Sequence, residues 1–253
     1  WDSPWGEGRP GWHIECSEMS KKYIGDTIDI HAGGEDLIFP HHENEIAQSE
    51  ACNDEPFANY WMHNGFLNID NKKMSKSAGN FFTVREISEK YPLQVIRFFM
   101  LCAHYRTPLY FSDTLVESAK TGLERILTAV DLCREMSQKD TGREISEEEK
   151  GHLEEVNRLV KKFEDAMEDD FNTADAVSAI FEIVRVSNST VKDAGAAYAG
   201  EVLKVFETLC GVLGIETKRR EEILDKEIEA LTEERNQARK EKNYARADEI
   251  RDQ

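Results

Sequence analysis

Apolar residues recur three and four positions apart along most of the chain after residue 83, which is the spacing of one face of an α-helix. Residues 171–173 (Phe-Asn-Thr) interrupt this pattern and are typical of a turn followed by a helix N-cap. Amphipathic helices joined by short turns favour a helical bundle. The segments with the clearest helical spacing are residues 112–133, 147–167 and 172–191.

Shorter segments of mixed periodicity precede residue 76. A helix, a strand and a glycine-rich turn follow one another there, which indicates an α/β architecture. The pattern predicts a loop over residues 1–11, a helix over 11–25 with Gly25 as its C-cap, a strand over 27–34, a helix over 39–52, and a strand or hairpin over 60–75 that leads into a polar loop.

The last segment, residues 227–253, predicts a charged helix with a thin apolar stripe formed by Ile228, Leu231 and Ala238. No apolar run in the chain approaches the roughly 20 residues that span a bilayer. We therefore expect no membrane role.

The acidic composition changes the expectation for partners. The net charge is −18, which normally argues against nucleic-acid binding because phosphate contacts need Lys and Arg. The excess of acid is greatest over residues 111–214, so any RNA surface is expected toward the two ends of the chain. Five widely spaced cysteines without a CxxC pair argue against a disulfide framework and for a reducing, cytoplasmic location.

The chain starts at Trp1 without a Met, and no basic segment followed by an apolar stretch is found there. A signal peptide is therefore not expected. We interpret the start as sequence from the middle of a longer protein.

A first candidate site combines Cys16 with the run His41-His42-Glu43-Asn44-Glu45. On a helix, His41 and Glu45 are four positions apart and share one face, so imidazole and carboxylate can bind one ion. A thiolate from Cys16 would complete a mixed set that suits zinc better than magnesium or calcium. Spacing alone leaves a plainer alternative open, in which Cys16 is an ordinary buried thiol and the histidines are a polar helix start.

A second candidate is the run Lys73-Met74-Ser75-Lys76-Ser77, followed by Ala78-Gly79-Asn80. Two ammonium groups three positions apart on a loop with hydroxyls can meet a polyphosphate. A solvated surface loop explains the same residues without any ligand.

Two further features need interpretation. Residues 6–11 formally match G-x-G-x-x-G, but no hydrophobic strand precedes them and Pro10 interrupts the loop, so a dinucleotide site is rejected. Trp12, His13 and His31 are candidates to line a small ligand pocket, with a core tryptophan and a capping histidine as the alternative.

Together these segments resemble one family. GWHIECS, HAGGEDLIFPHHENEIAQSE and KMSKSAGNFFTV, in this order and spacing, closely resemble cysteinyl-tRNA synthetases of class I. The resemblance is dense from residue 1 to about 110 and returns in ERNQARKEKNYARADEIRD, while the helices between match mainly in pattern.

This resemblance implies that Cys16, His41 and Glu45 are three of four ligands of one zinc ion, and that His42 is dispensable. The fourth ligand, a cysteine, is expected upstream. The zinc would select the thiolate of substrate cysteine over serine without editing. Trp12 and His31 resemble residues that wall the cysteine pocket, while no role is assigned to Asp36.

The KMSKS run implies ATP binding by Lys73, Met74, Ser75, Lys76 and Ser77, with Lys73 and Lys76 in catalytic roles. The ammonium groups, particularly that of Lys76, would meet charge that develops on the departing pyrophosphate. Magnesium would accompany the nucleotide.

The expected fold is the C-terminal part of a Rossmann-like catalytic domain followed by a helical tRNA-binding bundle. The expected domains are the catalytic part with the zinc site and KMSKS loop (1–82), a stem-contact region (83–111), an anticodon-side bundle (112–215), and a linker helix with the start of a C-terminal tRNA-binding domain (216–253). The expected partners are cysteine, ATP and tRNA(Cys).

The His-x-Gly-His motif of class I synthetases is absent from the chain. We therefore expect a fragment that needs an N-terminal half of the same enzyme for activity. Two alternatives stay open: the related cysteine ligase of mycothiol biosynthesis, and a noncatalytic zinc- or RNA-binding module. The terminal helix favours the synthetase, because the sugar ligase has no tRNA to hold.

Overall fold

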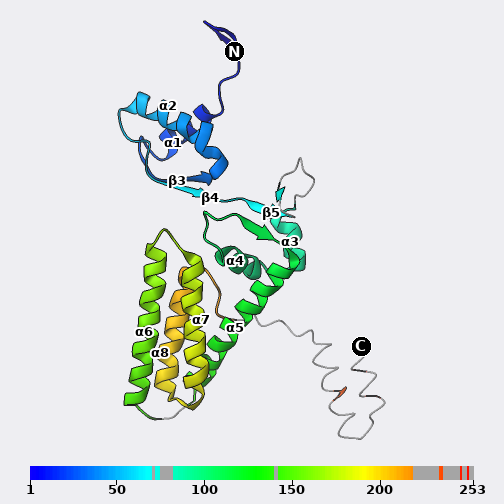
Figure 1. Cartoon of the computed structure of the whole chain (residues 1–253), viewed down its shortest axis with the longest axis vertical. Coiled ribbons are helices and arrows are strands. Elements are labelled where there is room, and N and C mark those ends of the chain that lie inside the picture. The colour runs from blue at the N-terminus through cyan, green and yellow to red at the C-terminus, as the bar shows by residue number, and fades with distance from the viewer. Residues whose placement is uncertain are drawn as a thin grey trace. The chain divides into compact units, whose positions relative to one another are not determined.

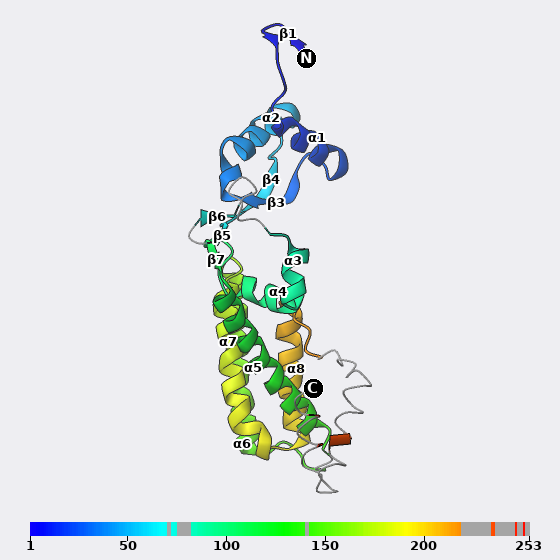
Figure 2. The same cartoon turned by 90° about the vertical axis from the view of Figure 1, so that its right-hand side faces the viewer.

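The computed structural model describes residues 1–69, 72–74, 82–139 and 142–218, and residues 234, 235, 246 and 250. The chain divides into two units, Trp1–Ile215 and Glu216–Gln253. Figures 1 and 2 show the helices and strands of the first unit. Nearly all described residues belong to the first unit, and the predicted helix over 227–253 lies almost wholly outside them. Among the described residues, no helix is both long and apolar enough to cross a membrane.

The predicted loop over residues 1–11 is wrong in part. Strands β1 (Asp2–Ser3) and β2 (Gly6–Glu7) pair as a small antiparallel hairpin. The Ser3 hydroxyl closes the turn, since it donates to the Gly6 carbonyl over 2.6 Å and accepts from the Trp5 N–H over 3.2 Å. Gly6 has a φ of +109°, which only glycine adopts easily.

Helix α1 (His13–Tyr23) and strand β3 (Ile28–Gly34) follow as predicted. The C-cap is Ile24 and not the predicted Gly25, whose N–H bonds the Ser20 carbonyl just beyond the helix. β3 pairs in parallel with β4 (Ala58–Asn64), and the Ile28 N–H bonds the Phe57 carbonyl where the two strands begin.

The helix predicted over 39–52 begins later than expected. Glu35–Leu37 form a 3-10 turn (η1) and Ile38–His42 a wider turn (η2), before helix α2 runs from Glu43 to Asn53. Phe39 has extended backbone angles, which interrupt regular helix, and the peptide bond from Phe39 to Pro40 is cis. The Asn44 side chain donates to the Pro40 carbonyl over 2.7 Å and fixes this entry into α2.

The strand or hairpin predicted over 60–75 proves to be parts of two sheets. β4 belongs to the parallel pair, whereas β5 (Leu67–Ile69) pairs antiparallel with β6 (Lys72–Lys73). A third strand, β7 (Leu109–Phe111), joins β5 in parallel. β7 was missed because three residues are too few to show an alternating pattern.

Two short helices separate the sheet strands β6 and β7. α3 (Val84–Lys90) starts with a capping box in which Thr83 and Glu86 bond each other's backbone N–H groups. α4 (Leu93–Leu101) follows Pro92 and buries Phe98 and Phe99. Pro92 stops α3 because the residue before a proline disfavours helical angles.

The remaining helices form the predicted bundle, with bounds α5 (Asp113–Ser137), α6 (Glu147–Glu168), α7 (Thr173–Thr190), a 3-10 turn η3 (Val191–Asp193) and α8 (Ala196–Val212). Asn172 caps α7 as expected, accepting the Asp175 N–H over 3.2 Å. The main hydrophobic core lies among these helices and α4; Val116, Ile126, Ile180, Ile183 and Phe206 are fully buried in it.

A buried carboxylate joins two ends of the bundle. Glu149, 6% exposed, accepts the Ser146 N–H over 2.7 Å and the Gly195 N–H over 2.8 Å, and pairs with Arg143. Burial acts to raise the pKa of Glu149, but these N–H groups, helped by the guanidinium, outweigh it and hold the pKa below its usual range. The start of α6 is thereby fixed to the start of α8.

Candidate metal and amino-acid site

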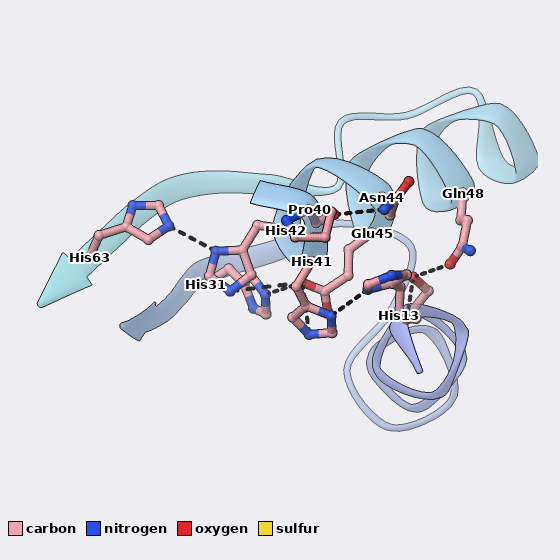
Figure 3. Close-up of polar contacts among 10 residues, drawn as sticks. His13, His31, Pro40, His41, His42, Asn44, Glu45, Gln48 and His63 are labelled. Atoms are coloured by element: carbon pink, nitrogen blue, oxygen red, sulfur yellow. Dashed lines mark hydrogen bonds and ion pairs between the residues drawn. The ribbon is translucent and has the colours of Figure 1, made fainter. Parts of the chain in front are cut away.

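The three residues predicted to bind one ion come together in space. Cys16 lies on α1, His41 in η2 and Glu45 in the first turn of α2 (Figure 3 shows the two from η2 and α2). Their candidate ligand atoms all lie within 4.8 Å of one another. His41 and Glu45 are only 4% and 0% exposed. This grouping has the donors of a zinc site, although zinc binding itself stays a prediction.

The Glu45 carboxylate is the centre of the cluster. Its Oε2 atom lies 2.9 Å from His31 Nε2, 3.7 Å from His41 Nε2 and 3.9 Å from His42 Nε2. Its Oε1 atom is buried and has no hydrogen-bond partner among the described residues. A buried polar atom left in this state costs about 1–3 kcal/mol, more when it is charged. A cation on this face would remove that cost.

A second set of candidate ligands shares the same carboxylate. His31, His42 and Glu45 also place ligand atoms within 4.8 Å of one another. Nδ1 of His42 lies 2.8 Å from Nε2 of His63. Burial, followed by the charges of His31, His63 and His41, lowers the pKa of His42 to about 4, so its ring is neutral at pH 7. Sequence reasoning treated His42 as dispensable and did not foresee this position.

Aromatic rings wall the cluster. Trp12 stacks on His41 with ring centroids 3.7 Å apart and an interplanar angle of 6°. Trp61 meets His31 edge-on at 4.8 Å. Nδ1 of His13 lies 2.8 Å from Nδ1 of His41, which leaves Nε2 of His41 turned toward Glu45 (Figure 3). The structure thus places both predicted pocket residues, Trp12 and His31, against predicted metal ligands.

Sequence reasoning missed two contributors, Trp61 and His63. Trp61 and His63 reach the site because β4 runs parallel to β3, in a register that places Trp61 opposite His31. A histidine on a strand carries no signal of its own in the sequence. His13 was among the candidates to line a pocket, and the structure places it against His41.

A glycine allows the backbone of β3 to approach the histidine cluster. A Cβ atom at Gly33 would lie 2.9 Å from both His42 Cε1 and Leu37 Cδ1. Contacts under 3.0 Å are essentially never seen for real Cβ atoms, so any larger residue would displace His42 or Leu37.

The thiol of Cys16 is tuned by its surroundings. Burial, followed by the nearby Glu45 and Glu15 carboxylates, raises its pKa above the ordinary value. In the absence of a cation the sulfur therefore keeps its proton at neutral pH. A bound metal ion reverses this balance, because a coordinated thiol loses its proton.

The KMSKS run is described only in part. Lys73 lies in β6 opposite Asn68, and the Met74 N–H bonds the Leu67 carbonyl over 3.0 Å. Ser75, Lys76 and Ser77 lie outside the described residues. The predicted contacts with ATP therefore stay predictions.

Comparison with known proteins finds two matching domain families. Residues 1–121 match the family of tRNA synthetases class I (C) catalytic domains, and residues 162–217 match the DALR domain. The chain is 63% identical over its whole length to a protein named cysteine--tRNA ligase from Lachnospira eligens, and covers 54% of it. Proteins of the same name from Lachnoclostridium phytofermentans and Clostridioides difficile are 58% and 54% identical, with 99% and 100% of the chain matched.

The chain spans about half the length of these relatives, covering 54%, 55% and 55% of them. Solved structures give the same fold at low identity. A LeuRS–tRNA–LeuAMS ternary complex from Agrobacterium radiobacter K84 matches 74% of the chain, which covers 27% of that protein, with a TM-score of 0.60 and 17% identity. A putative arginyl-tRNA synthetase from Campylobacter jejuni matches 83% of the chain, which covers 52% of it, with a TM-score of 0.60 and 13% identity. At these identities the likeness concerns the fold alone.

Proposed function

We propose that this chain, as a member of the class I cysteinyl-tRNA synthetase family, forms the metal-binding part of a cysteine–tRNA ligase. Such an enzyme activates cysteine with ATP and transfers it to tRNA(Cys). The observation that carries the proposal is the grouping of Cys16, His41 and Glu45, whose ligand atoms lie within 4.8 Å of one another. The buried Oε1 atom of Glu45, which has no hydrogen-bond partner in the described part of the chain, adds to it.

The donor set fits zinc. A thiolate, an imidazole and a carboxylate are ordinary zinc ligands, and a site with three protein ligands from this chain leaves room for a further one. By the family resemblance that ligand is a cysteine from the N-terminal half of the enzyme. Bound zinc would supply a soft Lewis acid that holds a sulfur anion and disfavours a hydroxyl. His13 orients His41 from its other nitrogen, which is how metal-bound histidines are commonly held.

The residues around the metal site can select the amino acid. Trp12 and His31 border it, with Trp12 half exposed and His31 partly buried. We propose that these two side chains wall a pocket for the cysteine side chain, in which discrimination against serine depends on the sulfur rather than on size.

We assign ATP binding to Lys73, Met74, Ser75, Lys76 and Ser77, with Mg²⁺ accompanying the nucleotide. Lys73 and Lys76 are the proposed catalytic groups. Their ammonium groups would stabilise negative charge that builds on pyrophosphate as the cysteine carboxylate attacks the α-phosphate. The run begins inside β6, at Lys73, so the pairing of β5 with β6 holds its start.

We propose the domain division 1–82, 83–111, 112–215 and 216–253, with tRNA contacts in the last three segments and a cytoplasmic location. The match of residues 162–217 to the DALR domain supports a synthetase-type bundle. The name cysteine--tRNA ligase, shared by the relatives, favours this function over the mycothiol-pathway ligase and over a noncatalytic module.

Metal analysis tests the ligand assignment. We would replace the matching segment of the Lachnospira eligens relative by residues 1–253 and measure zinc in the purified hybrid. Cys16→Ser and His41→Ala should lose most of the zinc, while His42→Ala should keep it. Zinc lost from His42→Ala but kept by His41→Ala would move the site to the second ligand set and refute the assignment.

Cysteine-dependent pyrophosphate exchange tests the activity. The unsubstituted hybrid should exchange, and residues 1–253 alone should not. Adding the N-terminal half of the relative as a separate chain could restore activity to residues 1–253. Robust exchange by residues 1–253 alone would mean that the ATP site has been misplaced.

A further inference from the structure

The turn between α4 and β7 is in close backbone contact with the end of β4. The Gly65 N–H bonds the Tyr105 carbonyl over 2.8 Å. A Cβ atom at Gly65 would lie 2.7 Å from the Thr107 carbonyl carbon and 2.8 Å from the Pro108 nitrogen. Gly65 comes two positions after His63, whose ring contacts the histidine cluster. The backbone of residues 105–108 is therefore in direct contact with the strand that delivers His63.

The same turn is held from the bundle side by one carboxylate. Asp170 follows α6 and has a φ of +55°, so the chain reverses there before α7. Its Oδ1 atom accepts the Tyr105 hydroxyl over 2.6 Å, and its Oδ2 atom accepts the Arg106 Nε–H. His104 Nε2 lies 3.9 Å from Oδ2. Figure 1 shows the α6–α7 turn at the end of the bundle that lies toward β4 and β5.

A second contact supports this junction. The Thr173 hydroxyl, in the first turn of α7, donates to the Ala103 carbonyl over 3.3 Å. Residues 103–106 are thus bonded on one side to the α6–α7 turn and on the other, through Gly65, to the end of β4. We call this group of contacts the Asp170 clamp.

The clamp contributes little to stability. The side chains of Asp170 and Arg106 are 40% and 53% exposed, and exposed ion pairs are worth about 0–1 kcal/mol. Yet four residues converge on one turn that has left-handed backbone angles at both Asp170 and Phe171. Fixing the geometry between the bundle and the strands explains this convergence better than stability does.

We propose that Asp170 is a positioning residue that fixes the bundle against the end of β4, so that a tRNA held by the bundle presents its acceptor end correctly at the amino-acid site. This inference rests on the proposed function. It predicts that loss of the clamp slows transfer to tRNA and leaves activation of cysteine, which needs no tRNA, largely unaffected.

The hybrid enzyme described above gives the kinetic test. Asp170→Asn should lower the aminoacylation rate constant roughly tenfold, in the range of energetic couplings between sites, while pyrophosphate exchange changes by less than about twofold. Asp169→Asn, the matched control in the same turn, should change neither. Arg106→Gln should have the same effect, and the double variant should be no slower than either single one. Equal losses in both reactions, or additive losses, would overturn the inference.

A second measurement does not depend on activity. Amide hydrogen exchange at Gly65, whose N–H bonds the Tyr105 carbonyl, should become faster in Asp170→Asn than in Asp169→Asn when both are made in residues 1–253. An unchanged exchange rate would refute the clamp. If the unsubstituted hybrid were inactive, that result would count against the proposed function alone. The amide hydrogen exchange of Gly65 would then still test the Asp170 clamp.

Discussion

Replacing Glu45 by Gln should shift the stability of the chain in opposite directions with and without zinc. In the absence of metal, Glu45 buries a carboxylate whose Oε1 atom has no partner among the described residues, at a cost of about 1–3 kcal/mol or more. Gln has nearly the same shape and can keep the 2.9 Å contact with His31, but carries no charge. We expect the free energy of unfolding to rise by about 1 kcal/mol.

With zinc the order should reverse. A lost ligand should weaken zinc binding by at least about 100-fold, because loss of groups that only orient ligands already costs 10–100-fold. At a free zinc concentration of about 100 times the wild-type Kd, zinc stabilises the wild type by about 2.7 kcal/mol. The same concentration equals the Kd of the variant, where stabilisation is about 0.4 kcal/mol. The wild type should then be the more stable protein, by about 1 kcal/mol.

Tryptophan fluorescence during urea unfolding, with zinc or with a chelator, measures both quantities. All four tryptophans precede residue 62, and two of them, Trp12 and Trp61, border the site. Glu43→Gln is the control, because Glu43 is exposed in the same first turn of α2. A Glu45→Gln variant that is less stable than the wild type under both conditions would show that the carboxylate supports the fold and does not await a cation.

Lys76→Ala in the hybrid should slow pyrophosphate exchange, because the activation free energy should rise by roughly 2–4 kcal/mol. An unchanged maximal rate with a raised Michaelis constant for cysteine would contradict a catalytic role of Lys76. Gly33→Ala should destabilise the site by about 1–3 kcal/mol in the same fluorescence assay, and Gly8→Ala, which has open space around it, should not. Glu149→Gln should destabilise the bundle by about 1–3 kcal/mol at pH 7 by circular dichroism, with Glu148→Gln as the exposed control. Folding lowers the pKa of Glu149, so its carboxylate stabilises the fold above the unfolded pKa of about 4.3. This stabilisation is lost as the pH falls through the folded pKa. The difference in stability between the wild type and Glu149→Gln should therefore shrink in acid.

The helical half of the chain was predictable because its signals are local. Periodicity gave α5, α6 and α7, and Asn172 marked the start of α7. The grouping of His41 with Glu45 was also a local inference, because residues four positions apart lie on one face of a helix. In the structure His41 ends η2 and Glu45 lies in the first turn of α2 that follows.

The rest of the site depends on contacts between distant segments. His31 and His63 meet the cluster only because β3 and β4 pair in parallel, and a periodic pattern does not reveal pairing partners. Likewise, no local signal marks β7 as the neighbour of β5. Spacing alone left open whether Cys16 is a ligand or an ordinary buried thiol, and the resemblance to a family decided for the ligand.

The order of strands in the second sheet has a consequence for synthesis on the ribosome. β5 can close its hairpin with β6 as soon as both leave the exit tunnel, but its other edge stays open until β7 emerges about 40 residues later. At 5–20 residues per second this edge is exposed for about 2–8 seconds. The nascent chain therefore carries an unpaired strand edge during elongation, and slow codons between residues 74 and 108 would lengthen the period in which a chaperone is needed to shield it.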